Sequence, residues 1–254
     1  MDRRSQGTVY THIENHIGNV EFGHPASNSL PTALLERIAN AFEELSNAPE
    51  VRLIVLSSEE ERAFCAGASF DEMVAVQTPE ESIRFFSGFA KVLNAMRKCS
   101  KLIVGRIQGK VVGGGVGLVS ACDYCFAVEA ASLKLSELSI SIGPFVIEPA
   151  IVRKSGLAAF STMALNPTQW HTAYWAKDQG LYTRVFENIS EMDKEIDFYV
   201  QKMATYSPEA LARMKTLLWE NTEHWETLLF ERAKITGELA LSKTTQQVIR
   251  RLKK

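Results

Sequence analysis

The stretch Ile107-Gln108-Gly109-Lys110-Val111-Val112-Gly113-Gly114-Gly115 joins a short apolar run to a cluster of glycines. The apolar run, Leu102 to Ile107, is typical of a buried strand. The residues after the glycines predict a short helix that leads to another strand over Tyr124 to Val128. Glycine lets the main chain approach a ligand closely, and the first N–H groups of a helix have no partner within it. The sequence therefore predicts a strand, a tight turn and a helix, with main-chain donors exposed at the turn.

A second turn of small residues lies about forty-five residues earlier, in Phe64-Cys65-Ala66-Gly67-Ala68-Ser69-Phe70. It follows the apolar run Leu53 to Leu56, and a helix beginning at Phe70 would direct its positive end toward the turn. Two such turns, each at the end of a strand, can present two N–H donors to one oxygen, as an oxyanion hole requires. The sequence contains no dinucleotide-binding fingerprint, Walker A loop or nucleophile elbow, which argues against nucleotide binding and serine hydrolysis.

The composition is that of an ordinary globular protein. The 254 residues are 46% hydrophobic and 23% charged, with a formal net charge of -2, so we expect no nucleic-acid partner. No apolar run predicts a membrane span, and residues 1–7 are not followed by the apolar segment of a secretion signal, so we expect a cytoplasmic protein. Cys122 and Cys125 have no second pair, and the histidines lack metal-site spacing, so we expect buried thiols and no metal.

Apolar strands alternate with amphipathic helices over most of the chain, which predicts an α/β fold with a largely parallel sheet. The expected elements are a hairpin over Val9 to Ile13 and Ile17 to Phe22, and helices over Pro31 to Leu45, Pro79 to Arg97, Glu191 to Thr205, Pro208 to Trp219 and His224 to Leu241. Because the last three helical patterns have no strand between them, we expect one domain with a core over residues 1–190. Residues 191–254 would form a helical C-terminal region that packs on the sheet or on a neighbouring subunit.

Several segments resemble the crotonase superfamily. They are Ala63 to Ala68 (F-x-A-G-A-D in the family), Ile107 to Gly115 (I-x-G-x-x-x-G-G-G), Ala121-Cys122-Asp123, and His24-Pro25 with Asn28-Ser29-Leu30 (P-x-x-N-A-L). The resemblance extends from about Val9 to the C-terminal helices. It implies a crotonase-like ββα spiral core with a C-terminal helical subdomain, and a homotrimer or a dimer of trimers.

The resemblance also implies an acyl-coenzyme A substrate whose enolate is stabilised in an oxyanion hole. The donors would be the main-chain N–H groups of Ala68 and Gly114, and the main chain of Ala66 and Ser69 would line the coenzyme A site. Ser69 replaces the family's usual Asp, but a hydroxyl can still cap a following helix. Coenzyme A would arrive as part of the substrate, and we expect no permanently bound cofactor.

The acidic residues at the family's catalytic positions indicate which reaction the resemblance implies. Hydratases of the family use two glutamates, and the position of the first is Gly117 here, whereas the second is kept as Glu137. A single carboxylate can move a proton from C2 to C4, so this layout favours double-bond isomerisation over hydration, which also needs a positioned water. Dienoyl isomerases and aromatic dehalogenases have an Asp at the position of Phe145, which argues against both activities.

Glu148 leaves an alternative open. It lies in an otherwise apolar stretch, Ile142 to Pro149, where a carboxyl is suited to general acid or base catalysis. In that role it would restore a two-carboxylate enoyl-CoA hydratase, and otherwise it would be the first-turn acid of a helix before Pro149, stabilised by the helix dipole. The remaining alternative is a non-catalytic acyl-CoA-binding homologue that has lost its water-activating acid.

Overall fold

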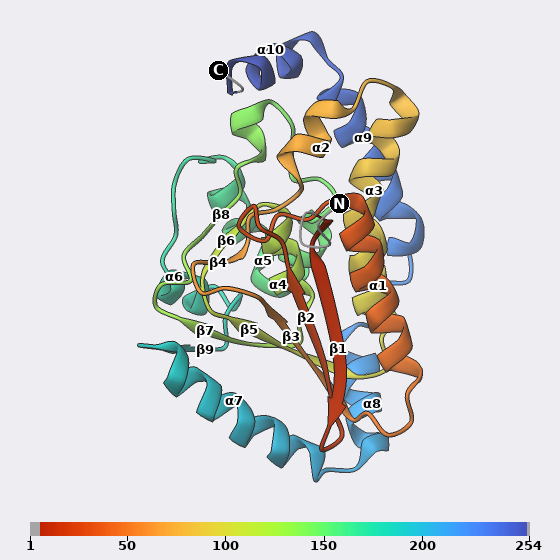
Figure 1. The fold of residues 1–254 in the computed structure, drawn as a ribbon, viewed down its shortest axis with the longest axis vertical. Coiled ribbons are helices and arrows are strands. Elements are labelled where there is room, and N and C mark those ends of the chain that lie inside the picture. Colours follow the sequence, from red (N-terminus) through yellow and green to blue (C-terminus); the bar gives the residue numbers. More distant parts are fainter. Residues whose placement is uncertain (1–5, 253–254) are drawn as a thin grey trace.

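The computed structural model describes residues 6–252 and contains a six-stranded sheet with the strand order β1-β2-β3-β5-β7-β9 (Figure 1). The strands are β1 (Thr8–Glu14), β2 (Ile17–Gly23), β3 (Leu53–Ser58), β5 (Leu102–Ile107), β7 (Tyr124–Val128) and β9 (Arg184–Phe186). β1 and β2 pair antiparallel as the expected hairpin, and every later pair is parallel. The predicted α/β fold is confirmed. The expected absence of a secretion signal concerns residues 1–7, of which 1–5 lie outside the described range.

A second, three-stranded parallel sheet positions the two small-residue turns. Its strands are β4 (Ala63–Cys65), β6 (Lys110–Val112) and β8 (Leu133–Lys134), in the order β4-β6-β8. β4 leads into the first turn, β6 leads into the glycine cluster, and β8 precedes Glu137 by three residues. Because the carboxyl ends of parallel strands lie at the same edge of a sheet, these three segments meet at one place.

Helices cover both faces of the large sheet. α1 (Thr32–Asn47) and α3 (Pro79–Lys98) pack on each other, and α1 contacts β1 and β2, while α7 (Ile189–Ala204) packs against β2, β3 and β7 (Figure 1). α9 (Trp225–Ala240) lies along α3. The other helices are α2 (Phe70–Ala75), α4 (Gly114–Ala121), the 3₁₀-helix η2 (Glu137–Ile140), α5 (Glu148–Ala164), α6 (Ala173–Asp178), α8 (Pro208–Leu218) and α10 (Lys243–Leu252).

The three helical patterns expected after residue 190 correspond to α7, α8 and α9, with ends that differ by one or two residues. α10 was not expected, because its short polar sequence does not extend the apolar pattern of α9. A division of the chain at residue 190 stays a prediction.

A buried ion pair anchors α8 to the sheet. The ammonium group of Lys215 lies 2.9 Å from Oδ2 of Asp123, and the two side chains are 3% and 4% exposed. Asp123 also accepts hydrogen bonds from the main-chain N–H of Ile103 and from the indole N–H of Trp219, each at 2.7 Å. The Asp123 carboxylate therefore connects the start of β5, the segment before β7 and the C-terminal helices.

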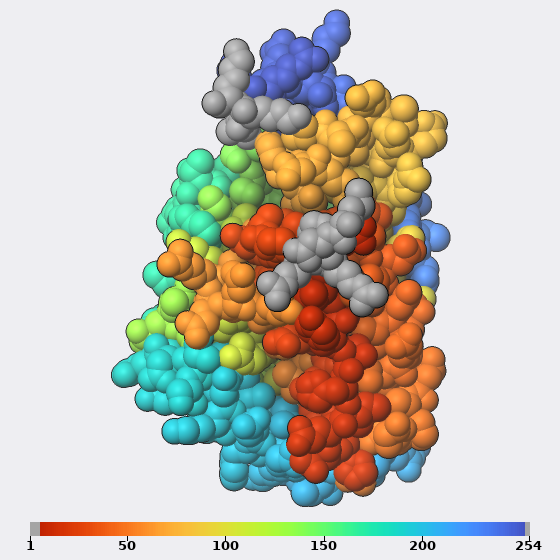
Figure 2. Space-filling view, in the orientation of Figure 1, coloured from red at the N-terminus to blue at the C-terminus, as the bar shows by residue number. Residues whose placement is uncertain are grey.

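The surface in Figure 2 shows the β1–β2 hairpin at the centre of one face, with α7 below it and α10 at the upper end. All four cysteines are buried and free, as expected for Cys122 and Cys125. None of the helices between residues 6 and 252 is long and apolar enough to cross a membrane.

Candidate active site

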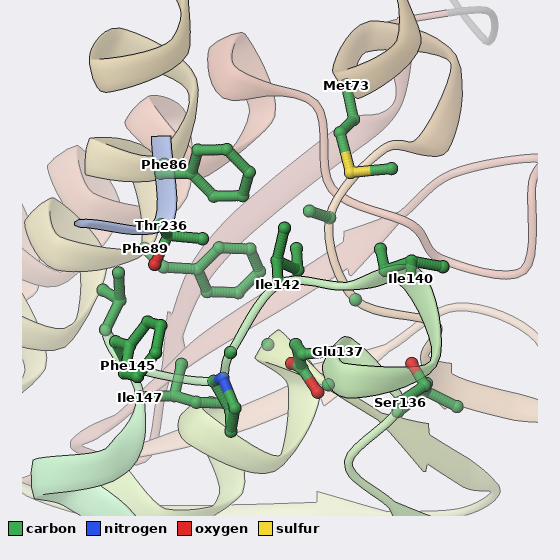
Figure 3. A pocket seen from close by; sticks show the side chains of 18 of the residues that line it. Met73, Phe86, Phe89, Ser136, Glu137, Ile140, Ile142, Phe145, Ile147 and Thr236 are labelled. Carbon is green, nitrogen blue, oxygen red and sulfur yellow. The ribbon is translucent and has the colours of Figure 1, made fainter. Parts of the chain in front are cut away.

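A cavity of about 290 Å³ lies where the two turns and η2 meet (Figure 3). Its lining consists of Ala66, Gly67, Ala68, Phe70, Met73, Phe86, Phe89, Val112, Gly113, Gly114, Ser136, Glu137, Ile140, Ile142, Gly143, Pro144, Phe145, Val146, Ile147 and Thr236. Among these residues, only Ser136, Glu137 and Thr236 have polar side chains, and only Glu137 is ionisable. The cavity is therefore an apolar chamber with one carboxyl group.

The first turn leaves one main-chain donor free. Gly67 has a φ of 90°, a conformation that favours glycine, and its carbonyl accepts the N–H of Leu30 at 2.8 Å. The N–H of Ser69 donates to the carbonyl of Leu30 at 3.1 Å. Because donors alternate sides along extended backbone, the intervening Ala68 N–H points away from Leu30, and it has no acceptor among the described residues.

The second turn places another free donor beside the first. Gly113 has a φ of 54° and donates its N–H to the carbonyl of Lys134 at 3.0 Å. α4 begins at Gly114, so the N–H of Gly114 has no acceptor within the helix. A Cβ atom added at Gly67 would lie 3.1 Å from the Val112 carbonyl oxygen and 3.6 Å from the nitrogen of Gly114. The structure thus brings the two predicted oxyanion-hole turns into direct contact.

Glu137 directs its carboxyl into the same place. It is the first residue of η2, and a Cβ atom added at Gly113 would lie 2.8 Å from its Oε1. Oε2 is buried and has no hydrogen-bond partner among the described residues. Burial raises the pKa of Glu137 to about 7, although the main-chain amides of Glu137 and Ser136 act in the opposite direction. A carboxyl that is half ionised near neutral pH is well suited to accept and return a proton.

Aromatic and branched side chains surround the rest of the cavity. Phe86 and Phe89 come from α3, and Phe145 comes from the segment before α5 (Figure 3). A Cβ atom added at Gly114 would lie 2.2 Å from the Phe89 ring, so this ring packs directly on the second turn. The amphipathic pattern of α3 predicted a buried face for this helix, but not that the face would line a cavity.

Gly117 and Ile147 pack against each other behind the cavity. A Cβ atom added at Gly117 would lie 2.5 Å from Cγ2 of Ile147. Gly117 is buried and does not line the cavity, whereas Ile147 does. The Ile147 side chain therefore occupies the space into which a side chain at position 117 would extend.

The structure does not bring Glu148 to the cavity. Glu148 is the first residue of α5, and its Oε2 lies 3.7 Å from a guanidinium nitrogen of Arg232 on α9. Its side chain is 22% exposed, and it is absent from the cavity lining, which ends with Ile147 on this segment. The arrangement is that of a first-turn acid with a cation beside it.

Ala66 and Ser69, the two residues expected to contact coenzyme A, differ in whether they line the cavity. Ala66 lines the cavity, while its N–H donates to the carbonyl of Ser27 at 3.2 Å. Ser69 does not line the cavity. Its hydroxyl accepts the N–H of Glu72 at 3.3 Å and caps α2, as predicted, and its N–H is bonded to Leu30. Of this pair, Ala66 alone lines the cavity.

The C-terminal helix supports the segment that carries Glu137. Ser141 ends η2 with a φ of 62°, and its N–H donates to the carbonyl of Leu138 at 3.0 Å. The hydroxyl of Thr245, a fully buried residue of α10, donates to the Ser141 carbonyl at 3.1 Å. Sequence patterns did not indicate this contact, because it joins residues 104 positions apart.

Comparisons with known proteins relate this chain to one family. Residues 12–249 match the family described as enoyl-CoA hydratase/isomerase. The chain is 26% identical over 239 residues to a Bacillus subtilis (strain 168) protein named "Probable enoyl-CoA hydratase", covering 93% of this chain and 92% of the relative. It is also 26% identical over 211 residues to the peroxisomal Delta(3,5)-Delta(2,4)-dienoyl-CoA isomerase of Arabidopsis thaliana, covering 77% of this chain and 74% of that protein.

The fold matches solved structures over nearly its whole length. The crystal structure of enoyl-CoA hydratase from Bacillus halodurans has a TM-score of 0.89 at 19% identity and covers 96% of this chain and 99% of that chain. An enoyl-CoA hydratase from Mycobacterium avium has a TM-score of 0.85 at 25% identity, with 99% and 96% coverage. The crotonase-like fold predicted from the sequence is confirmed. This chain therefore belongs to the enoyl-CoA hydratase/isomerase family within the crotonase superfamily, and it is an enzyme of this kind.

Proposed function

We propose that this enzyme moves a double bond of an acyl-coenzyme A thioester from the 3,4 to the 2,3 position, with Glu137 as its only catalytic carboxylate. One observation carries the proposal. Among the described residues that line the cavity, Glu137 alone is ionisable, and it lies beside the turn that bears the free Gly114 N–H. Its pKa of about 7 suits both removal and return of a proton.

The chemistry follows from this arrangement. The thioester oxygen accepts hydrogen bonds from the N–H groups of Ala68 and Gly114, which stabilise negative charge as it develops on that oxygen. The Glu137 carboxylate removes a proton from C2, and the electron pair of the C–H bond delocalises into the thioester as an enolate. The same carboxyl then protonates C4 while the double bond forms between C2 and C3. No net proton or electron is gained, so no cofactor beyond the coenzyme A of the substrate is required.

The two alternatives rest on fewer features of the cavity. A hydratase with Glu148 as second acid would need that side chain to leave Arg232 and enter the cavity, which it does not line. Relatives named as hydratases keep this alternative worth testing. A non-catalytic acyl-CoA-binding homologue would not require a buried carboxyl with a raised pKa, because burial of that group costs free energy without function.

The test is turnover of 3-hexenoyl-CoA and of crotonyl-CoA by the wild-type enzyme and two matched variants. We expect isomerisation of 3-hexenoyl-CoA to fall by about 100-fold or more in Glu137→Gln and to stay near the wild-type rate in Glu148→Gln. Binding of hexanoyl-CoA, measured by calorimetry, should survive both substitutions. Hydration of crotonyl-CoA that Glu148→Gln abolishes would establish the two-carboxylate mechanism instead. Binding of hexanoyl-CoA without turnover of either enoyl-CoA would establish the non-catalytic alternative.

A homotrimer or a dimer of trimers is also part of the proposal. Large apolar side chains are exposed on α5 and α8, including Leu157 (66% exposed), Leu165 (76%) just after α5, and Leu217 (55%). These side chains would take part in the contacts between subunits if they form a contiguous apolar patch, since such patches mark protein–protein contact sites. Size-exclusion chromatography with light scattering distinguishes a mass of three or six chains from that of one. The expected cytoplasmic location stays a prediction.

A further inference from the structure

The side chains of the cavity offer a water molecule very few partners. An ordered buried water typically makes about three hydrogen bonds to polar groups. The polar side chains in the lining are the carboxyl of Glu137 and the hydroxyls of Ser136 and Thr236, and the amides of Ala68 and Gly114 would be engaged by the thioester oxygen. The Thr236 hydroxyl already donates to the carbonyl of Arg232 at 3.0 Å. Among the side chains of the lining, water therefore has its best partners next to Glu137.

The opposite side of the cavity floor is apolar. In Figure 3 the Glu137 carboxyl and the Ile147 side chain approach the lower part of the cavity from different sides. Ile147 is 3% exposed, and its neighbours in the lining are Phe145 and Val146. Behind it, the 2.5 Å separation between Cγ2 and an added Cβ at Gly117 shows that Ile147 occupies the place of a side chain at position 117. This side has no side chain that could hold or deprotonate water.

We propose that Ile147 is the specificity-determining residue of this enzyme: it keeps nucleophilic water away from C3 and so directs the reaction to isomerisation. The inference rests on the proposed function and explains its selectivity. Hydration would require a base to take one proton from water while the water oxygen bonds to C3. The π electrons would move toward C2 and the thioester oxygen, and Glu137 would then protonate C2. An isoleucine side chain supplies neither the base nor a hydrogen-bond acceptor for that water.

The first experiment measures how the wild-type enzyme divides its substrate between isomerisation and hydration. Purified enzyme is supplied with 3-hexenoyl-CoA in ¹⁸O-labelled water, and the 2-hexenoyl and 3-hydroxyhexanoyl products are quantified by mass spectrometry. We expect the labelled hydroxyacyl product to form about 100-fold more slowly than the 2-enoyl product, which is the low end of the contribution of a positioned general base. Hydration at a rate within tenfold of isomerisation would overturn the proposal.

The second experiment introduces a carboxylate at the proposed position. Ile147→Glu places an acid in the volume that now excludes water, and Ile147→Gln is the matched control with nearly the same shape and no basic group. We expect Ile147→Glu to hydrate crotonyl-CoA about 100-fold faster than Ile147→Gln. Equal hydration rates in the two folded variants would refute the role of Ile147.

The outcomes separate this proposal from the proposed function. Circular dichroism and hexanoyl-CoA binding identify a variant that has not folded, and the wild-type partition then decides alone. If the wild-type enzyme isomerises nothing but Ile147→Glu gains hydration that Ile147→Gln lacks, the proposed isomerisation fails and the role of Ile147 stands. If the wild-type enzyme isomerises and hydrates at similar rates, the proposed isomerisation stands and the role of Ile147 fails.

Discussion

Replacement of Glu137 by Gln should raise the free energy of unfolding, relative to that of the wild type, by more at pH 8 than at pH 5. The wild-type carboxyl is held in an apolar cavity where Oε2 has no partner among the described residues, and burial raises its pKa to about 7. Because the folded-state pKa lies above the unfolded value of 4.5, the folded chain binds this proton more tightly. The stabilisation is fully present below pH 4.5 and is lost as the pH rises through 7.

The magnitude follows from the size of the pKa shift. Each pKa unit corresponds to 1.36 kcal/mol of differential interaction, so a shift from 4.5 to about 7 sets an upper limit of about 3 kcal/mol. Since Glu137 as a whole residue is only partly buried, solvent screening reduces the expected value to about 2 kcal/mol. The wild-type free energy of unfolding should therefore fall by about this amount between pH 5 and pH 8, beyond any change in the variant.

Urea denaturation followed by circular dichroism, at pH 5 and at pH 8, measures the difference between wild type and Glu137→Gln. Glu44→Gln, on the exposed face of α1, is the control, and its difference from the wild type should be the same at both pH values. The pH-independent cost of placing an amide in the cavity cancels in this comparison. The free energies of unfolding of the wild type and Glu137→Gln could instead differ by the same amount at pH 5 and at pH 8. That result would show that the Glu137 carboxyl is solvated and would refute the reasoning.

Other predictions follow from the same contacts. The kcat/KM for a 3-enoyl-CoA should rise with pH through a midpoint near 7, because the Glu137 carboxylate is the active form, and initial-rate measurements from pH 5 to 9 test this. Gly114→Ala should lower kcat/KM by about 100-fold, because its Cβ would lie 2.2 Å from the Phe89 ring and displace the N–H donor; adding Phe89→Ala should restore part of the loss. Asp123→Asn should lower the free energy of unfolding by about 3–5 kcal/mol by leaving Lys215 buried and unpaired, as urea denaturation would report.

The sequence predicted those parts of the site that local motifs encode. Gly67 and Gly113 adopt positive φ values at the two turns, and glycine at such positions is recognisable in a sequence. The strands β3 and β5, each of which comes one strand before a turn, were recognisable from their apolar runs, and the helix after each turn was also predicted. Glu137 was found because it lies in a recognisable segment, although its inward orientation comes from η2, which begins at that residue.

Contacts between distant segments could not be predicted in this way. The strands β4, β6 and β8 contain only two or three residues each, too few for an alternating pattern to be recognised. The role of Ile147 depends on its contact with Gly117, which only the packing of α4 against the segment before α5 creates. Whether Glu148 faced the cavity or a cation depended on Arg232, 84 positions later in the chain.

The hydrogen bond from Thr245 to Ser141 has a practical consequence. It connects α10 to the residue that terminates η2, four positions after Glu137. Cutting the chain before α10 would remove a brace from the active centre while leaving the sheet and its glycine bends intact. Such a shortened enzyme should keep its fold and still capture thioesters, yet turn them over slowly, so expression designs for this protein should spare that end.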